Sequence, residues 1–234
     1  MEQTNSKFKE KPLLTAPSAE NPAYIFHHFI KSGGTSITNV LRKWFNVIND
    51  HFVSFDQLEE YKAKRVDINN IKSNDCIVGH YAVEGTYLFQ RYPEILKRKD
   101  EIKVFTFLRD PLEFCLSLYF YSKKHGRMDQ SMEKFFESNK DLLAYYMPCY
   151  FDYKEVLDRY FFIGITERMD ESLKKLSSLV GRPLPEIQIL NSTERDDQNE
   201  IVTDEFRRWF RYRNGIDYAM YQYALDRLDS IPYN

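Results

Sequence analysis

Four short runs of almost continuously apolar residues stand out along the chain. They cover residues 23–30, 75–78, 102–108 and 160–165. A strand that is covered on both faces has this pattern, because neither of its faces meets water. The pattern therefore predicts four strands of a buried, parallel sheet.

Helical spacing and helix-end residues fill the segments between these runs. We expect helices over residues 37–44, 54–65, 169–180, 203–213 and 216–228. A further helix should start after the third strand, with Asp110 as N-cap, Pro111 at the first helical position and Glu113 at the third. Gly181 and Pro183 mark the end of the helix over residues 169–180.

Strands that alternate with helices predict an α/β fold, in which a parallel sheet is flanked by helices on both faces. In such sheets, ligands bind beyond the carboxyl ends of the strands. The polar residues that follow the apolar runs are Lys31, Gly79-His80, Arg109 and Thr166-Glu167-Arg168. We therefore expect these residues to meet at one edge of the sheet.

Length and charge limit the possible partners. The 234 residues suffice for one domain, and we expect a flexible N-terminal segment over residues 1–20 and a single domain over residues 21–234. Lys and Arg total 33 and Asp and Glu total 35, so the net charge is -2. A chain with this charge has no global positive field to hold a polyanion, so no nucleic acid partner is expected.

The three cysteines and the hydropathy pattern bear on the compartment. Cys76, Cys115 and Cys149 are too scattered for a disulfide framework or for metal-ligand spacing, which favours a reducing compartment. The first 20 residues lack the apolar core of a signal peptide, and no segment reaches the ~18 apolar residues of a membrane span. We therefore expect a cytoplasmic protein without a membrane span.

The connection between the first strand and the first helix has the composition of an anion-binding loop. It reads Lys31, Ser32, Gly33, Gly34, Thr35 and Ser36. The two glycines allow a tight turn, and the helix that follows contributes free N–H donors and the positive end of its dipole. The order differs from the Walker pattern, in which glycine precedes a lysine and a hydroxyl residue holds magnesium, so no metal is expected. Alternatively, the loop is an ordinary connection whose lysine and serine face water.

A second candidate anion site begins where the third strand ends. Arg109 has a planar fork that suits two phosphate oxygens, and Ser117 follows eight residues later, about two helical turns on. The sequence thus predicts two anion sites at one sheet edge.

These motifs together resemble the sulfotransferases that use 3′-phosphoadenosine 5′-phosphosulfate (PAPS) as donor. The likeness is to the group with a Lys-x-Gly-Gly-Thr loop, which includes heparan sulfate 2-O-sulfotransferase and many bacterial enzymes. Residues 28–36 resemble the 5′-phosphosulfate loop, residues 109–117 the 3′-phosphate element, and residues 78–80 the segment with the catalytic histidine. Two departures are Ile30, where proline is common, and Phe114, where arginine is frequent.

The resemblance implies a P-loop-like nucleotide-binding sulfotransferase fold and transfer of a sulfuryl group from PAPS to a hydroxyl acceptor. Lys31 and His80 would be the catalytic residues, as stabiliser of the leaving phosphate and as general base. Cofactor-binding residues would be Lys31, Ser32, Gly33, Gly34, Thr35, Ser36, Arg109 and Ser117. A carbohydrate is the favoured acceptor, and a small alcohol or a carrier-tethered hydroxyacyl group is the second choice.

Other interpretations remain open at this point. A nucleotide-dependent small-molecule kinase would need a metal-binding carboxylate and a Walker lysine, and a non-catalytic nucleotide-binding protein would need only the fold. We expect His27 and His28, inside the first strand, to be structural. Basic residues around 91–99 and 123–127 either guide an acidic substrate or, as we favour, form solvated faces.

Overall fold

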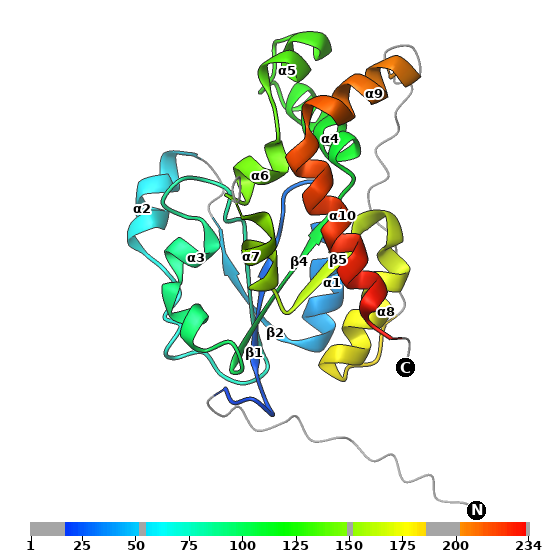
Figure 1. The fold of residues 1–234 in the computed structure, drawn as a ribbon. Coiled ribbons are helices and arrows are strands. Elements are labelled where there is room, and N and C mark those ends of the chain that lie inside the picture. The colour runs from blue at the N-terminus through cyan, green and yellow to red at the C-terminus, as the bar shows by residue number, and fades with distance from the viewer. Residues whose placement is uncertain (1–16, 52–54, 149–151, 186–201, 233–234) are drawn as a thin grey trace, which may run out of the picture.

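The computed structural model describes residues 17–51, 55–148, 152–185 and 202–232 (Figure 1). Of the N-terminal segment expected to be flexible over residues 1–20, residues 1–16 lie outside this part of the chain, as does Cys149.

Five parallel strands form one sheet in the order β2-β3-β1-β4-β5. The strands are β1 (Ala23–His27), β2 (Asn46–Asp50), β3 (Asp75–Gly79), β4 (Ile102–Leu108) and β5 (Phe162–Ile165). Every residue of β1, β3 and β5 is buried, which confirms that the continuous apolar runs are strands covered on both faces. The first strand ends at His27 rather than at residue 30, so the segment after it is free to turn.

The sequence pattern missed β2, the edge strand beside β3. This strand contains only two apolar residues, Val47 and Ile48, between polar ones, and it is mostly half-buried or exposed. An edge strand that is partly exposed to solvent can contain polar residues, so it does not show a continuous run of apolar residues.

Helices pack on both faces of the sheet. In Figure 1, α7 and α10 lie in front of the strands and α1, drawn fainter, lies behind them. The helices are α1 (Gly34–Trp44), α2 (Leu58–Ala63), α3 (Leu88–Arg91), α4 (Pro111–Lys124), α5 (Met132–Ser138), α6 (Leu142–Tyr146), α7 (Tyr153–Asp158), α8 (Met169–Val180), α9 (Asp204–Arg213) and α10 (Gly215–Ser230). Single 3₁₀ turns are η1 (Phe55–Gln57), η2 (Pro93–Lys97) and η3 (Thr166–Arg168). Within the described residues, no helix is long and apolar enough to span a bilayer.

Two helix ends follow the sequence prediction closely. The side chain of Asp110 accepts hydrogen bonds from the backbone N–H groups of Leu112 and Glu113, so it caps α4. Gly181 ends α8 in the left-handed conformation, with a φ of 66°. Both predictions are confirmed.

A buried carboxylate fastens α10 to α6. Asp217 is fully buried and accepts hydrogen bonds from the backbone N–H groups of Leu143 and Ala144, each at 2.9 Å. Burial raises the pKa of Asp217 to about 7, against the lowering effect of these two donors. The first turn of the five-residue helix α6 is thus satisfied by a side chain of another helix.

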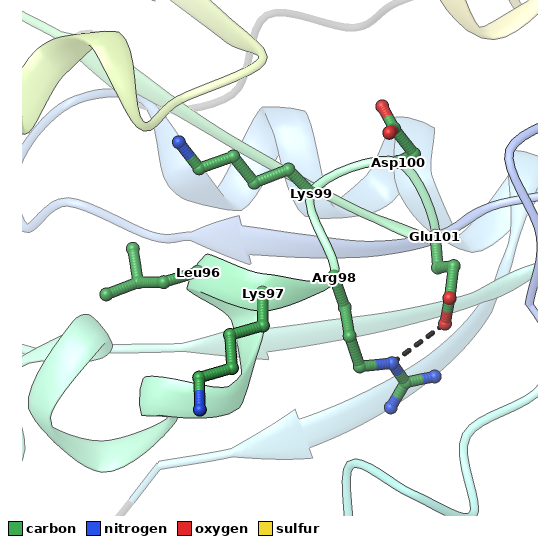
Figure 2. A pocket seen from close by; sticks show the side chains of 6 residues that line it. All are labelled: Leu96, Lys97, Arg98, Lys99, Asp100 and Glu101. Atoms are coloured by element: carbon green, nitrogen blue, oxygen red, sulfur yellow. Dashed lines mark hydrogen bonds and ion pairs between the residues drawn. The ribbon is translucent and has the colours of Figure 1, made fainter.

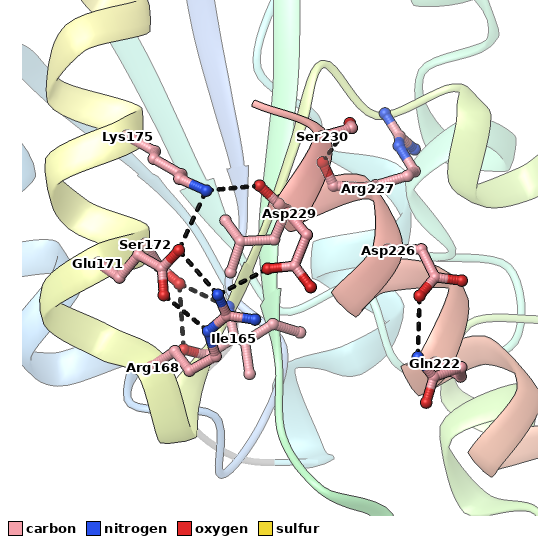
Figure 3. Close-up of polar contacts among 11 residues, drawn as sticks. Ile165, Arg168, Glu171, Ser172, Lys175, Gln222, Asp226, Arg227, Asp229 and Ser230 are labelled. Carbon is pink, nitrogen blue, oxygen red and sulfur yellow. Dashed lines mark hydrogen bonds and ion pairs between the residues drawn. The ribbon is translucent and has the colours of Figure 1, made fainter. Parts of the chain in front are cut away.

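An ion-pair cluster joins α8 to the end of α10 (Figure 3). Arg168 lies 2.7 Å from Glu171 and 2.6 Å from Asp229, and Lys175 lies 3.0 Å from Glu171. The Lys175 ammonium also donates to the backbone carbonyl of Leu228 at 2.8 Å. Arg168, which the sequence places just after the last strand, therefore helps to hold α8 against α10.

The basic residues of segment 91–99 lie away from the carboxyl edge of the sheet or are already paired. Arg91 is buried and bonds Asp50 through two nitrogens, at 2.9 and 3.1 Å. Figure 2 shows a shallow pocket lined by residues 96–101, in which Arg98 pairs with Glu101 at 2.8 Å. This pocket precedes β4, so it lies at the amino end of that strand.

Candidate functional site

The strand order brings three candidate residues to neighbouring strand ends. The loop with Lys31 follows β1, His80 follows β3 and Arg109 follows β4. Because β1 lies between β3 and β4, His80 and Arg109 flank the Lys31 loop on either side. The sheet edge predicted from the polar residues after each strand is therefore the edge at which they meet.

The loop after β1 turns sharply into α1. Gly33 has a left-handed φ of 77° and precedes the first helical residue, Gly34. No side chain caps α1 at Gly33, so the helix start presents its amides without a competing side-chain acceptor at that position. Ser32 and Ser36 are buried, whereas Thr35 is exposed.

Gly34 is required by the close approach of His28. A Cβ atom at Gly34 would lie 1.6 Å from Nε2 of His28, so a larger residue cannot occupy this position without displacing the ring. The His28 ring also lies 4.1 Å from the His80 ring, measured between centroids. The imidazole of His28 therefore sits between the loop and His80.

The hydrogen bond to His80 determines which of its nitrogens is protonated. Its Nδ1 lies 2.9 Å from the backbone carbonyl oxygen of His28. A carbonyl only accepts, so Nδ1 carries the proton and the neutral ring has its free lone pair on Nε2. Burial lowers the pKa of His80, the His28 carbonyl opposes this shift, and nearby His51 adds to it. The geometry thus favours a neutral imidazole that can accept a proton.

The sequence did not reveal the histidine group around His80. His28 is half-buried, and burial followed by the charge of His80 lowers its pKa to about 3. His51, just after β2, places its ring 5.9 Å from that of His80. His27 points elsewhere: it is buried and its Nδ1 lies 2.7 Å from the Tyr160 hydroxyl. His51 is brought close to His80 by the pairing of β2 with β3, and the sequence pattern did not predict β2.

Arg109 connects the loop to two carboxylates. Its Nη1 donates to the backbone carbonyl of Lys31 at 3.3 Å. Its Nη2 lies 3.5 Å from Glu113 and its Nε lies 3.7 Å from Glu167. The guanidinium therefore has carboxylate neighbours that the sequence analysis did not anticipate, although the i, i+4 spacing of Arg109 and Glu113 was a signal for one of them.

Ser117 lies on the face of α4 that meets the loop. Phe114, three residues before it, places its ring 5.5 Å from that of Phe29, and Tyr121, four residues after it, lies under the ammonium of Lys31. Residues at these spacings share a helix face. The buried Ser117 is therefore on the side of α4 that faces residues 29–31.

Lys31 has an unusual backbone and side-chain environment. Its φ of 58° lies in the left-handed region, which non-glycine residues rarely adopt. Its Nζ lies 3.9 Å from the centroid of the Tyr121 ring. Burial and then the charge of Arg109 lower the pKa of Lys31.

A cleft of about 460 Å³ adjoins Arg109 at the start of α4. Its lining includes three acidic residues, Asp110, Glu113 and Glu167, and three basic residues of α9, Arg207, Arg208 and Arg211. These arginines could not be predicted from the sequence, because no apolar run or motif links α9 to the sheet edge. Among the described residues, no group of three or more His, Cys, Asp or Glu side chains is arranged to hold a metal ion.

Comparisons with known proteins bear on the fold. No family model and no curated protein matches the chain. A sulfotransferase from Alicyclobacillus acidocaldarius is similar in structure with a TM-score of 0.48 and 14% identity, over 85% of this chain and 95% of that one. Mouse sulfotransferase SULT7A1, solved with PAP, gives a TM-score of 0.50 at 14% identity, over 88% of this chain and 90% of that one. The chain therefore has the P-loop-like α/β fold of sulfotransferases of known structure.

Proposed function

We propose that this protein transfers a sulfuryl group from PAPS to a hydroxyl acceptor. The observation that carries the proposal is the placement of His80, with Nε2 as its unprotonated nitrogen, beside the Lys31 loop at one sheet edge. The motif resemblance and the shared fold with SULT7A1, which was solved with PAP, support the same donor.

The loop fits the 5′-phosphosulfate end of the donor. Gly33 is left-handed, Gly34 has no room for a side chain, and α1 begins without a side-chain cap. Backbone N–H groups at a helix start bind anions well, so residues 33–36 would hold the phosphate oxygens. The ammonium of Lys31 would stabilise the negative charge that develops on the leaving phosphate.

His80 would act as general base toward the acceptor hydroxyl. Its protonated Nδ1 is fixed by the His28 carbonyl, which leaves Nε2 to take the proton. The lowered pKa of His80 keeps the ring neutral near pH 7, the state in which a base is active.

Arg109 and Ser117 would bind the 3′-phosphate. Arg109 follows the end of β4, and Ser117 lies on the face of α4 that meets the loop. Arg109 shares its guanidinium with Glu113 and Glu167, and its five N–H donors allow it to bind a phosphate as well. Recognition of this phosphate would distinguish PAPS from ATP.

The acceptor proposed first is a carbohydrate hydroxyl, on the strength of the motif resemblance. A small alcohol or a carrier-tethered hydroxyacyl group is the alternative. The fold does not select among them, because one fold serves many acceptors.

A transfer assay with PAPS and a panel of these acceptors tests the proposal. Lys31→Ala should lower kcat by about 10²–10³-fold and His80→Ala by about 10²–10⁴-fold, while both variants keep the wild-type melting temperature within a few degrees. Lys174→Ala, which removes an exposed lysine on α8, serves as the matched control and should have no effect.

Three outcomes would contradict parts of the proposal. Unchanged turnover in the His80 variant would exclude this residue as base. Binding of adenosine 3′,5′-bisphosphate without turnover on any acceptor would indicate a non-catalytic binding protein. Magnesium-dependent consumption of ATP would indicate a kinase.

A further inference from the structure

We propose that Tyr121 is a positioning residue that holds the ammonium of Lys31 at the sheet edge. The inference rests on the function proposed above. It follows from a contact between two elements that are far apart in the sequence: the loop after β1 and the last turns of α4. Neither the sequence motifs nor the pairing of the strands assigns a role to this tyrosine.

The contact itself has the geometry of a cation–π interaction. Nζ of Lys31 lies 3.9 Å from the ring centroid of Tyr121, well within the ~6 Å at which a cation is attracted to an aromatic face. Tyr121 is 39% exposed, so its ring does not belong to the core of the sheet. Because the ring covers the half-buried ammonium and is itself exposed, its main contact in this region is with Lys31 and not with the core.

Lys31 is fixed at its backbone as well as at its tip. Arg109 donates a hydrogen bond to the Lys31 carbonyl at 3.3 Å, and the backbone has the rare left-handed φ of 58°. With the main chain held by Arg109 and the ammonium held by Tyr121, the flexible stem between them has few conformations left.

The ring of Tyr121 is itself supported. The His125 ring lies 4.1 Å from it, with 34° between the two planes. Nδ1 of His125 lies 2.7 Å from the carbonyl oxygen of Tyr121, which anchors His125 to the same helical turn. The Tyr121 ring is therefore in contact with both Lys31 and His125 near the end of α4.

An aromatic ring suits this task better than a carboxylate would. A carboxylate would neutralise the ammonium and occupy one or more of its three N–H donors. A ring face attracts the cation without accepting a conventional hydrogen bond, so charge and donors remain available for phosphate oxygens. Stabilisation of a developing charge is strongest when the donor is already oriented, and orientation is what the ring supplies.

Substitutions that keep or remove the ring face test the proposal. Tyr121→Leu removes the face, and Tyr121→Phe keeps it while removing the hydroxyl. We expect Tyr121→Leu to lower kcat with PAPS about 5- to 30-fold, the range of a partly desolvated cation–π contact, and Tyr121→Phe to retain most of the activity. Tyr212→Leu, at a position 91% exposed on α9, is the matched control and should leave kcat unchanged.

A second measurement does not depend on sulfuryl transfer. The rate at which an amine-reactive acylating reagent modifies Lys31 near pH 8, relative to Lys124, can be followed by mass spectrometry. Loss of the ring uncovers Lys31 and removes a contact that favours its protonated form, so Tyr121→Leu should raise this relative rate several-fold and Tyr121→Phe should not.

The two readouts separate this proposal from the proposed function. Equal losses of kcat in the Phe and Leu variants, or none in either, would overturn the positioning role. So would an unchanged labelling rate in Tyr121→Leu. If no protein shows sulfuryl transfer, wild type included, the proposed function fails, and the labelling rates alone decide whether Tyr121 holds Lys31.

Discussion

A single hydrogen bond gives His80 its proposed chemistry. Because the His28 carbonyl accepts from Nδ1, the lone pair lies on Nε2, and the ring must stay neutral to act as base. Burial lowers the pKa of His80 below its ordinary value of 6.5. In the proposed reaction, the pKa of His80 would therefore set the lower pH limit of activity.

We expect kcat/KM to fall as the pH drops through a midpoint below 6.5. The sign follows from the role: protonation removes the base, so activity is present above the pKa and lost below it. His51→Gln should move the midpoint upward, because His51 is one cause of the lowered pKa of His80. A pH profile of kcat/KM, taken at acceptor concentrations well below KM with saturating PAPS, measures the midpoint in the wild-type protein and in the variant. A midpoint that does not change in the His51 variant would contradict this account.

At the level of elements, the start of α1 depends on the fit between Gly34 and His28. Gly34→Ala would place a Cβ 1.6 Å from the His28 ring, so we expect a loss of about 1–3 kcal/mol in the free energy of unfolding. Adding His28→Ala should restore part of that loss, because the small residue makes room. Gly215→Ala, where a Cβ meets nothing within 4 Å, is the control. Urea denaturation of these three variants and of the wild-type protein measures the differences.

The link between α10 and α6 gives a second prediction for the elements. Asp217→Ala leaves two buried backbone N–H groups, those of Leu143 and Ala144, without their acceptor. We expect the free energy of unfolding to fall by about 2–6 kcal/mol, since each of the two unsatisfied buried groups costs about 1–3 kcal/mol. Asp226→Ala, at an exposed position of the same helix, should change it by less than about 0.5 kcal/mol. Similar losses in both variants would contradict the capping role.

Sequence patterns predicted the elements that carry strong local signals. The apolar runs of β1, β3, β4 and β5 and the ends of α4 and α8 have such signals. The edge strand β2 and the five-residue helix α6 lack such signals, and contacts with other elements stabilise them. For α6 the decisive contact comes from Asp217, more than 70 residues away. Hydrophobic periodicity contains no information about such a contact.

The candidate site also has features that the sequence predicts and features that only the fold reveals. The positions of Lys31, His80 and Arg109 at one edge follow from where strands end, which the sequence reveals. Side-chain neighbours across elements do not follow from it. The packing of His28 against Gly34 and the place of Tyr121 under Lys31 each require two segments to be brought together by the fold.

For the whole molecule, binding of a bisphosphate nucleotide should appear as added stability. A ligand at 100 times its Kd stabilises the folded state by about 2.7 kcal/mol, and for a chain of this size each kcal/mol raises Tm by about 2–4 °C. We therefore expect adenosine 3′,5′-bisphosphate at that excess to raise Tm by about 5–10 °C. Adenosine 5′-monophosphate at the same concentration should raise it less.

Arg109→Gln provides the control for this thermal shift. If Arg109 binds the 3′-phosphate, the variant should lose most of the difference between the two nucleotides. Equal shifts for both nucleotides in the wild-type protein would contradict 3′-phosphate recognition.

The left-handed backbone of Lys31 lowers local stability at a position where we expect the side chain to be needed for activity. Among variants that remove this side chain, Lys31→Gly should have a free energy of unfolding about 1 kcal/mol higher than that of Lys31→Ala, as measured by urea denaturation. The reason is that glycine adopts a φ of 58° without strain. Directed evolution for thermal tolerance alone would therefore favour glycine at this position, at the expense of the turnover that we attribute to the Lys31 ammonium. A lysine at this position is what we expect from selection for chemistry rather than for durability.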